Sequence, residues 1–413
     1  MKYIKIITTI FLIICSQISV AQSLQDSLKI ATEKLSKGLK EKNTSIIKEV
    51  LADNFAIGTR SWPASESLLD LIFQNVDFQS AELIAKDIKN SNDTIFTTIK
   101  FQTSKKVEES IIAFNNNYKI LFIDYFDRLY GQSRYRESKL KGKIPFRLID
   151  KSIVLTIKLN NNTQPLLFLL DTGADGMAIR KSLADSLNLK TNHTQNANIV
   201  GGQRQVSISS GNTVYISDSI SLKNQNIAIF ENIKNGVDGI IGLNLVNQYI
   251  FDINFDKEQI ALYTYGNYKY EVKGQIIDIT IPNKLIMIPA SLNIVGKKSV
   301  NGNFILDTGA NYHLIAFSRF VRKNRLLLTG FKPESSGTTV SLGHATPVYS
   351  GKAFEFRLND NIVLNDMPVT LQASTGSDNT NRTEPDGSIG IQFFYNYNFT
   401  IDLLRKQIFL TPR

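Results

Sequence analysis

The stretch FLLDTGA at residues 168–174 returns, with one residue changed, as FILDTGA at residues 304–310. In each copy a run of large apolar residues leads directly into Asp-Thr-Gly. A strand that is apolar on both faces is typical of the interior of a protein. The two copies therefore predict two buried strands, one ending at Asp171 and the other at Asp307.

A second motif follows each copy of the first, as DGIIG at residues 238–242 and DGSIG at residues 386–390. The two copies of the first motif lie 136 residues apart, and those of the second motif lie 148 residues apart. From the second motif onward the two halves align without a gap, through Phe251 and Phe399. Such an internal repeat predicts two lobes of one β unit, related by a pseudo-twofold axis.

The pseudo-twofold axis would bring the aspartates of the two lobes together. A lone ionised carboxylate is costly to bury, but two neighbouring carboxyl groups can share one proton, so that one is ionised and the other neutral. Such a pair can hold a water molecule, take its proton with the ionised group and polarise a carbonyl group with the protonated one. Asp171 and Asp307 are therefore the predicted catalytic residues, and they should titrate as a pair.

The residues around the two aspartates fit the same geometry. The supporting loops are Thr172, Gly173, Ala174, Thr308, Gly309 and Ala310. We expect the loop glycines to permit a tight turn, and the threonine hydroxyls to hydrogen-bond across the interface between the lobes. Gly242 and Gly390, at the end of the second motifs, should let a neighbouring strand pack closely beneath each loop.

Together these motifs resemble the aspartic peptidases of the retropepsin and pepsin group. The Asp-Thr-Gly-Ala form and the absence of cysteine after Cys15 are similar to the bacterial retropepsin-like branch, and the resemblance covers residues 145–413. It implies a mainly β fold of two β-barrel lobes and an endopeptidase that acts on peptides or proteins. Because both motifs lie in one chain, no dimer is required for the catalytic pair. Ser388 departs from the apolar residue that the family usually has there.

The alternative function is a catalytically inactive peptide-binding module with the same fold. The two hypotheses differ in whether the purified chain cleaves peptides and whether a pepstatin-type inhibitor stops it.

One feature of the predicted site concerns the pH range of its activity. Pepsin-like enzymes usually carry a hydroxyl residue where this chain has Ala174 and Ala310, and a hydroxyl there would lower the pKa of the aspartate. The absence of a hydroxyl at these two positions predicts activity at mildly acidic to near-neutral pH.

Candidate substrate-covering flaps are residues 200–204 in the first lobe and residues 335–337 and 342–344 in the second.

The composition gives little support to other chemistries. The three histidines, His193, His313 and His344, have no metal-ligand spacing, and the single cysteine leaves the mature chain without a thiol nucleophile or a cysteine-ligated zinc. We therefore expect no metal and no cofactor. The net charge is +10, but the basic run at residues 134–143 has the pattern of an exposed linker, so we expect no nucleic-acid partner.

The chain divides into five predicted segments. They are a signal peptide at 1–21, an α+β domain at 22–130, a basic linker at 131–147, lobe 1 at 148–270 and lobe 2 at 271–413. The signal peptide predicts a secreted or periplasmic protein with no membrane span in its mature form, since the apolar run at 6–14 is too short to cross a bilayer. A lipoprotein signal at Cys15 is the alternative, and Ile14 disfavours it.

The segment 22–130 has a pattern of its own. Apolar residues recur at helical spacing from Leu24 to Leu39, and strand-like alternation begins near Ile95. Helices followed by a curved antiparallel sheet resemble the NTF2-like (SnoaL-like) domains. The interpretations left open are a ligand-binding domain, a substrate-docking domain and a propeptide released by a cut in the linker.

Overall fold

The computed structural model describes residues 24–413 except 92, 200–201, 271–272, 342–343 and 374–384. The predicted signal peptide, 1–21, lies outside the described residues. The chain forms two compact units, one that ends at Arg136 and one from Glu137 to Arg413. In the part of the chain that is described, no helix is both long enough and apolar enough to cross a membrane.

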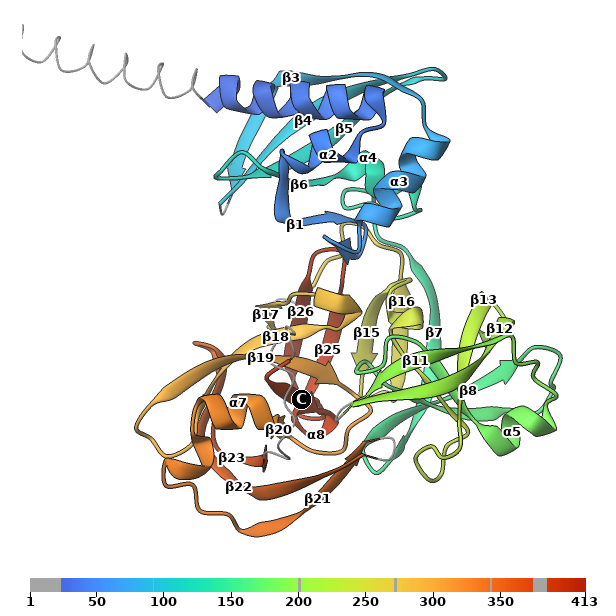
Figure 1. Ribbon diagram of the computed structural model, residues 1–413, viewed down its shortest axis with the longest axis vertical. Coiled ribbons are helices and arrows are strands. Elements are labelled where there is room, and N and C mark those ends of the chain that lie inside the picture. The colour runs from blue at the N-terminus through green and yellow to red at the C-terminus, as the bar shows by residue number, and fades with distance from the viewer. Residues whose placement is uncertain (1–23, 92, 200–201, 271–272, 342–343, 374–384) are drawn as a thin grey trace, which may run out of the picture. The chain divides into compact units, whose positions relative to one another are not determined.

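The first unit is α+β (Figure 1). Its helices span 24–41, Thr44–Lys48 (α2), Glu66–Asn75 (α3) and Asp124–Leu129 (α4). Its strands are Leu51–Ile57 (β1), Arg60–Ser61 (β2), Phe78–Ser91 (β3), Thr94–Thr103 (β4), Val107–Asn115 (β5) and Ile120–Ile123 (β6).

A six-stranded sheet in the order β2-β1-β6-β5-β4-β3 carries the core of this unit. All neighbouring strands are antiparallel except β1 and β6, which are parallel. The helix at 24–41 buries Leu28 and Leu35 in the same cluster as Ile99 and Phe101 of β4. The predicted helical and alternating patterns therefore meet at one interface, as an amphipathic helix on a sheet requires.

The second unit is built almost entirely of strands. Its first lobe contains Leu140–Ile149 (β7), Ser152–Leu159 (β8), Leu166–Leu170 (β9), Met177–Arg180 (β10), Lys181–Ser186 (α5), His193–Ile199 (β11), Gly202–Ser217 (β12), Ile220–Phe230 (β13), Gly239–Ile241 (β14), Leu243–Val246 (α6), Ile250–Asn254 (β15) and Gln259–Tyr263 (β16).

The second lobe repeats much of this order. It contains Gln275–Asp278 (β17), Pro282–Lys284 (η1), Met287–Asn293 (β18), Ser299–Asp307 (β19), Leu314–Ala316 (β20), Ser318–Lys323 (α7), Leu326–Leu328 (η2), Ser335–Ser341 (β21), His344–Asn359 (β22), Ile362–Gln372 (β23), Gly387–Gly390 (β24), Ile391–Phe394 (α8), Tyr397–Asp402 (β25) and Gln407–Pro412 (β26).

One sheet joins the two lobes, through the strand order β7-β16-β15-β25-β26-β17. Its central strands β15 and β25 are antiparallel, and Asp252 faces Thr400 in their register. These two residues occupy the same place in the sequence repeat, so the pseudo-twofold axis passes between them. The flanking hairpins obey the same symmetry, since Phe251 faces Leu262 as Phe399 faces Leu410.

The structure differs from the predicted basic linker at 131–147. Residues up to Arg136 belong to the first unit, and Leu140–Ile149 is strand β7, which pairs with β16 and β8. The strand buries Ile144 and Phe146 while Lys143 stays exposed. The basic residues from 141 onward therefore lie on the solvent side of a strand, where alternating charge is ordinary.

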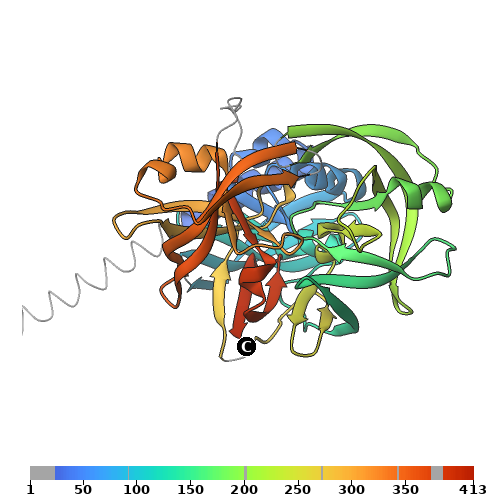
Figure 2. The same ribbon diagram turned by 90° about the horizontal axis from the view of Figure 1, so that it is seen from below.

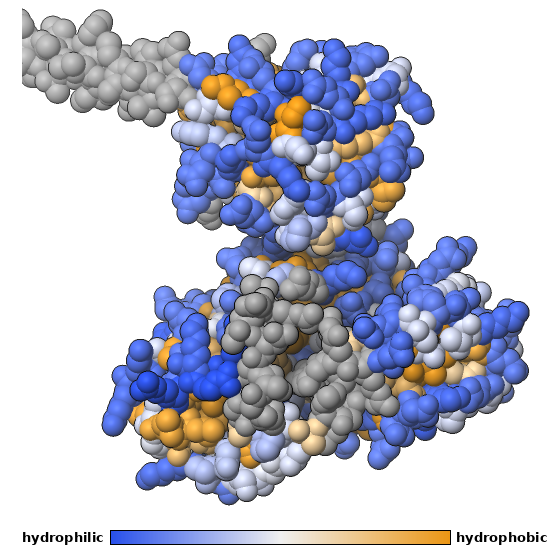
Figure 3. Space-filling model, viewed as in Figure 1, coloured by the Kyte–Doolittle hydropathy of each residue, from blue (hydrophilic) through white to orange (hydrophobic). Residues whose placement is uncertain are grey.

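The predicted fold class is confirmed, with a mainly β bilobal unit preceded by a small α+β unit. Figure 2 shows the two lobes of the second unit, green to yellow and orange to red, each as a folded sheet. The space-filling view in Figure 3 shows a surface that is mostly hydrophilic on this face, with separate apolar areas.

Candidate active site

Asp171 directly follows strand β9, and Asp307 is the last residue of strand β19. The three apolar residues directly before each aspartate are at most 6% exposed, which confirms the predicted buried strands. Each strand lies parallel to the strand of its own second motif, with Leu170 beside Ile241 and Leu306 beside Ile389. The two motifs of each lobe therefore meet at the site.

The aspartate of each second motif fixes this pairing, a role that the sequence analysis did not assign. Asp238 Oδ2 accepts a hydrogen bond from Leu167 N at 2.8 Å. Asp386 Oδ2 accepts the equivalent bond from Asn303 N at 2.9 Å. Each carboxylate thus anchors the strand that leads to its lobe's Asp-Thr-Gly, and the signal for it was the shared Asp-Gly at the start of both motifs.

The two aspartates of the first motif meet at the interface of the lobes, where their carboxyl groups are close enough to interact electrostatically. Both residues are half-buried and so retain accessible surface. Gly173 N donates to Asp171 Oδ1 at 2.9 Å, and Gly309 N donates to Asp307 Oδ1 at 3.1 Å. A Cβ atom on either glycine would lie within 3.0 Å of the carboxyl group from the other lobe. The motif glycines therefore allow the close approach of the pair.

The electrostatics of the pair are those of two acids in one low-dielectric site. Burial raises the pKa of Asp171 to about 8, and the negative charge of Asp307 adds to the rise. Burial also raises the pKa of Asp307, but hydrogen bonds from Ser388 and from Asp171 act against that rise. At neutral pH the pair can therefore keep one proton.

The two motif threonines cross-link the lobes beneath the pair, and both are 0% exposed. Thr172 Oγ1 donates to Leu306 O at 2.7 Å and accepts from Thr308 N at 3.0 Å. Thr308 Oγ1 donates to Leu170 O at 2.7 Å and accepts from Thr172 N at 3.1 Å. These four bonds have the symmetry of the sequence repeat and fix the distance between the two Asp-Thr-Gly loops.

The last glycine of each second motif lies directly under a catalytic loop. A Cβ atom on Gly242 would lie 2.6 Å from Gly176 O, and one on Gly390 would lie 2.7 Å from Ala310 O. Ala310 O accepts a hydrogen bond from Ile391 N at 2.9 Å, so the loop cannot move away without losing this contact.

Gly390→Ala is expected to lower the free energy of unfolding by about 1–3 kcal/mol and to reduce activity, because the new methyl group would displace the loop that carries Asp307. Chemical denaturation and a peptide-cleavage assay measure the two effects. The matched control for stability is Gly337→Ala on exposed strand β21, where a Cβ atom would meet nothing within 4 Å. Equal losses of the free energy of unfolding in the two variants would contradict the proposed close packing.

Other predicted site residues are distributed as follows. Ala174 and Ala310 approach the carboxyl groups only with backbone N–H groups. His313 is half-buried, burial lowers its pKa, and its backbone O accepts from Gly390 N at 3.0 Å.

Both predicted flap regions form β hairpins, β11–β12 and β21–β22. Residues 200–201 and 342–343 lie outside the described residues, so the flap assignment stays a prediction.

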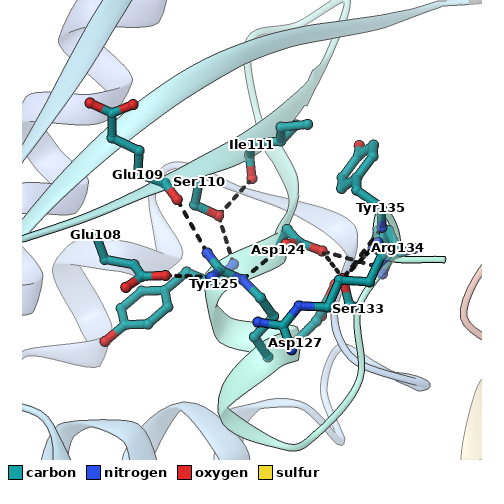
Figure 4. Close-up of polar contacts among 12 residues, drawn as sticks. Glu108, Glu109, Ser110, Ile111, Asp124, Tyr125, Asp127, Ser133, Arg134 and Tyr135 are labelled. Carbon is teal, nitrogen blue, oxygen red and sulfur yellow. Dashed lines mark hydrogen bonds and ion pairs between the residues drawn. The ribbon is translucent and has the colours of Figure 1, made fainter. Parts of the chain in front are cut away.

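The first unit also has a cavity of about 340 Å³, lined in part by Glu109, Asp124 and Arg128. Of its charged groups, Arg128 and Asp124 form an ion pair, and Figure 4 shows the polar contacts around them, with Asp127 and Arg134 close by. Arg134 Nε lies 2.7 Å from Asp127 Oδ2, and Arg128 forms ion pairs with Glu108 and Asp124. This network joins α4 to the end of the unit and has the properties of a structural ion-pair cluster. Among the described residues, no group of three or more histidine, cysteine or acidic side chains could hold a metal ion.

Comparison with known proteins agrees with this geometry. Residues 155–245 match the family described as "Aspartyl protease". The matched stretch contains Asp171 and Gly242, whereas Asp307 lies beyond it. No curated protein matches the chain significantly. Among solved structures, the aspartic proteinase from Irpex lacteus aligns over 67% of this chain and 97% of its own, at 13% identity and a TM-score of 0.42.

Proposed function

We propose that the protein is an aspartic endopeptidase in which Asp171 and Asp307 form the catalytic pair. The observation that carries the proposal is the close approach of two half-buried carboxyl groups at the interface of the lobes, where each lies within 3.0 Å of the position that a Cβ atom would take on the motif glycine of the other lobe. The pKa of each is raised, so the pair can hold one proton at the pH of the reaction. Peptide or protein is the proposed substrate, and one chain supplies the whole pair.

The proposed reaction is hydrolysis by a water molecule held between the carboxyl groups. The ionised carboxylate takes a proton from this water as the water oxygen bonds to the peptide carbonyl carbon. The protonated carboxyl group donates a hydrogen bond to the carbonyl oxygen and stabilises the charge that develops there. The C–N bond then breaks, the nitrogen takes up a proton, and the products are a carboxylic acid and an amine.

The test is cleavage of a mixed peptide library by the full purified chain between pH 4 and 8, with and without a pepstatin-type inhibitor. Cleavage that the inhibitor abolishes supports the proposal. Cleavage that the inhibitor leaves unchanged would contradict it. Inhibitor binding without any cleavage would favour the inactive peptide-binding module instead.

Two further parts of the interpretation are also proposals. A secreted or periplasmic location rests on residues 1–21 alone. The likeness of the first unit to NTF2-like domains is supported by its helices before β1 and by a sheet whose neighbouring strands are mostly antiparallel. Its role as a ligand-binding, docking or propeptide domain stays a prediction.

A further inference from the structure

The two halves of the catalytic pair have different surroundings at one equivalent position. In lobe 1, Ile240 of β14 lies beside Leu169 of β9, and in lobe 2, Ser388 of β24 lies beside Ile305 of β19. Both positions stand two residues before the last glycine of the second motif. The pseudo-twofold axis therefore relates an aliphatic side chain in lobe 1 to a hydroxyl in lobe 2.

The Ser388 hydroxyl faces the catalytic pair. Its Oγ donates to Asp307 Oδ2 at 3.2 Å, and the residue is 1% exposed. The Tyr312 side chain lies near both groups, and burial together with the charge of Asp307 raises its pKa. Asp307 thus accepts from the Ser388 hydroxyl in addition to its backbone donor Gly309 N. The sequence predicts threonine hydroxyls at the interface of the lobes, but it identifies Ser388 only as a departure from the family pattern.

Asp171 lacks the equivalent donor, because Ile240 has only carbon atoms in its side chain. Its Oδ1 accepts from Gly173 N at 2.9 Å, whereas Ala174 N donates to the backbone oxygen of Asp171 at 3.2 Å. A hydroxyl donor stabilises a carboxylate more than a neutral carboxyl group. The negative charge of the pair should therefore reside on Asp307 and the shared proton on Asp171.

The other charged groups near the pair do not reverse this preference. The charge of Lys234 favours the ionised form of Asp171, but Lys234 Nζ donates to Ser152 Oγ at 2.8 Å, its larger charge interaction is with Asp150, and burial lowers its pKa. Burial also lowers the pKa of His313 beside the second loop, and the nearby Lys151 acts in the same direction.

We propose that Ser388 is a positioning residue that localises the charge on Asp307, so that Asp307 is the general base and Asp171 the protonated group that polarises the peptide carbonyl. This inference rests on the proposed peptidase function. It assigns separate roles to two aspartates whose sequence motifs are identical. In the reaction, the water proton passes to Asp307, and the carbonyl oxygen accepts the hydrogen bond of protonated Asp171.

The first experiment compares the pH dependence of kcat/KM for the parent, Ser388→Ala and Ser388→Thr. Without the hydroxyl, the acid limb of the Ser388→Ala profile is expected to move up by about one pH unit, so that activity on that limb falls about tenfold while the plateau changes little. Ser388→Thr keeps a hydroxyl and should keep the parent profile. Tyr312→Phe tests whether the nearby Tyr312 hydroxyl also affects the position of the acid limb.

The second experiment moves the hydroxyl to the other lobe with Ile240→Ser in the Ser388→Ala background. A serine hydroxyl that donates to either carboxylate should return the acid limb toward the parent position. If the displaced limb came from a packing defect at residue 388, the added hydroxyl in lobe 1 would not restore it. A Ser388→Ala profile that superimposes on the parent profile, or a doubly substituted variant whose limb stays displaced, would overturn the inference.

A readout without activity separates this inference from the proposed function. Titration of ¹³C-labelled aspartate carboxyl groups by NMR should show Asp307 ionising before Asp171 in the parent, and a smaller difference in Ser388→Ala. If the parent cleaves no peptide, the proposed function fails, and this titration still decides where the charge resides. A parent in which Asp171 ionises first would overturn the inference whether or not the chain is active.

Discussion

Asp171→Asn and Asp307→Asn are each expected to reduce kcat/KM for peptide cleavage by about three orders of magnitude or more. Asparagine has nearly the size of aspartate, so the close approach permitted by the motif glycines should persist. The amide cannot take a proton from water or share one with the remaining carboxyl group. Loss of either member therefore removes the function of both, and the double variant should be little worse than either single variant.

The matched control is Asp175→Asn in the loop of Asp171. The Asp175 side chain is 64% exposed, and its nearest cation is Lys284 at 4.0 Å. Its substitution should leave kcat/KM within about twofold of the parent, because an exposed ion pair contributes little. Circular dichroism of all variants checks that the fold is kept. Folded variants of Asp171 and Asp307 that cleave like the parent would exclude the carboxyl pair as the catalytic centre.

The sequence was sufficient for the architecture of the second unit because its signals are repeated. Phe168 and Phe304 begin apolar runs that end at identical tripeptides, and a chance match seldom recurs with its partner motif in register. The repeat also gives the symmetry, since the pairing of Asp252 with Thr400 follows from the same alignment. A repeated pattern thus constrains long-range contacts that a single strand pattern leaves open.

Strand β7 shows what the sequence did not predict. Two of its first four residues are Lys141 and Lys143, and a basic run of this kind is typical of a linker as well as of a strand edge. The choice depends on whether β16 offers a pairing partner, which is a long-range property. Tertiary pairing therefore overrode a local composition signal.

Ser388 was noticed in the sequence only as a departure from the family pattern. Its role depends on the direction of one side chain relative to a carboxyl group from a motif 81 residues earlier in the chain. No spacing rule contains that direction. The comparison with Ile240 at the equivalent position was available from the repeat, and a residue that breaks an internal symmetry at a site is a useful signal.

Thr172→Val is expected to destabilise the second unit strongly. The substitution keeps the size of the side chain but leaves Leu306 O and Thr308 N without the hydroxyl partner, and each unpaired buried group costs about 1–3 kcal/mol. Thr308→Val should have a similar effect through Leu170 O and Thr172 N. Both variants should also lose activity by about tenfold or more, since the threonines fix the spacing of the two loops.

Urea unfolding can assign this loss to the second unit, because the only tryptophan, Trp62, lies in the first. Tryptophan fluorescence should therefore keep its midpoint, while the far-ultraviolet circular dichroism of the strands unfolds at lower urea. Thr97→Val is the matched control, since Thr97 is 2% exposed in the first unit and donates to Ile84 O at 3.3 Å. It should shift the fluorescence midpoint instead.

The double variant Thr172→Val/Thr308→Val completes the cycle. The two hydroxyl oxygens lie 3.4 Å apart, and each accepts from the backbone N–H of the other threonine, so the two losses should not add. Once the first hydroxyl is gone, the lobes can separate locally and water can reach the second set of partners. The double variant should therefore be destabilised by clearly less than the sum of the single variants. Strict additivity would mean that the two threonines act within their own lobes, and that the four bonds do not form one cross-link.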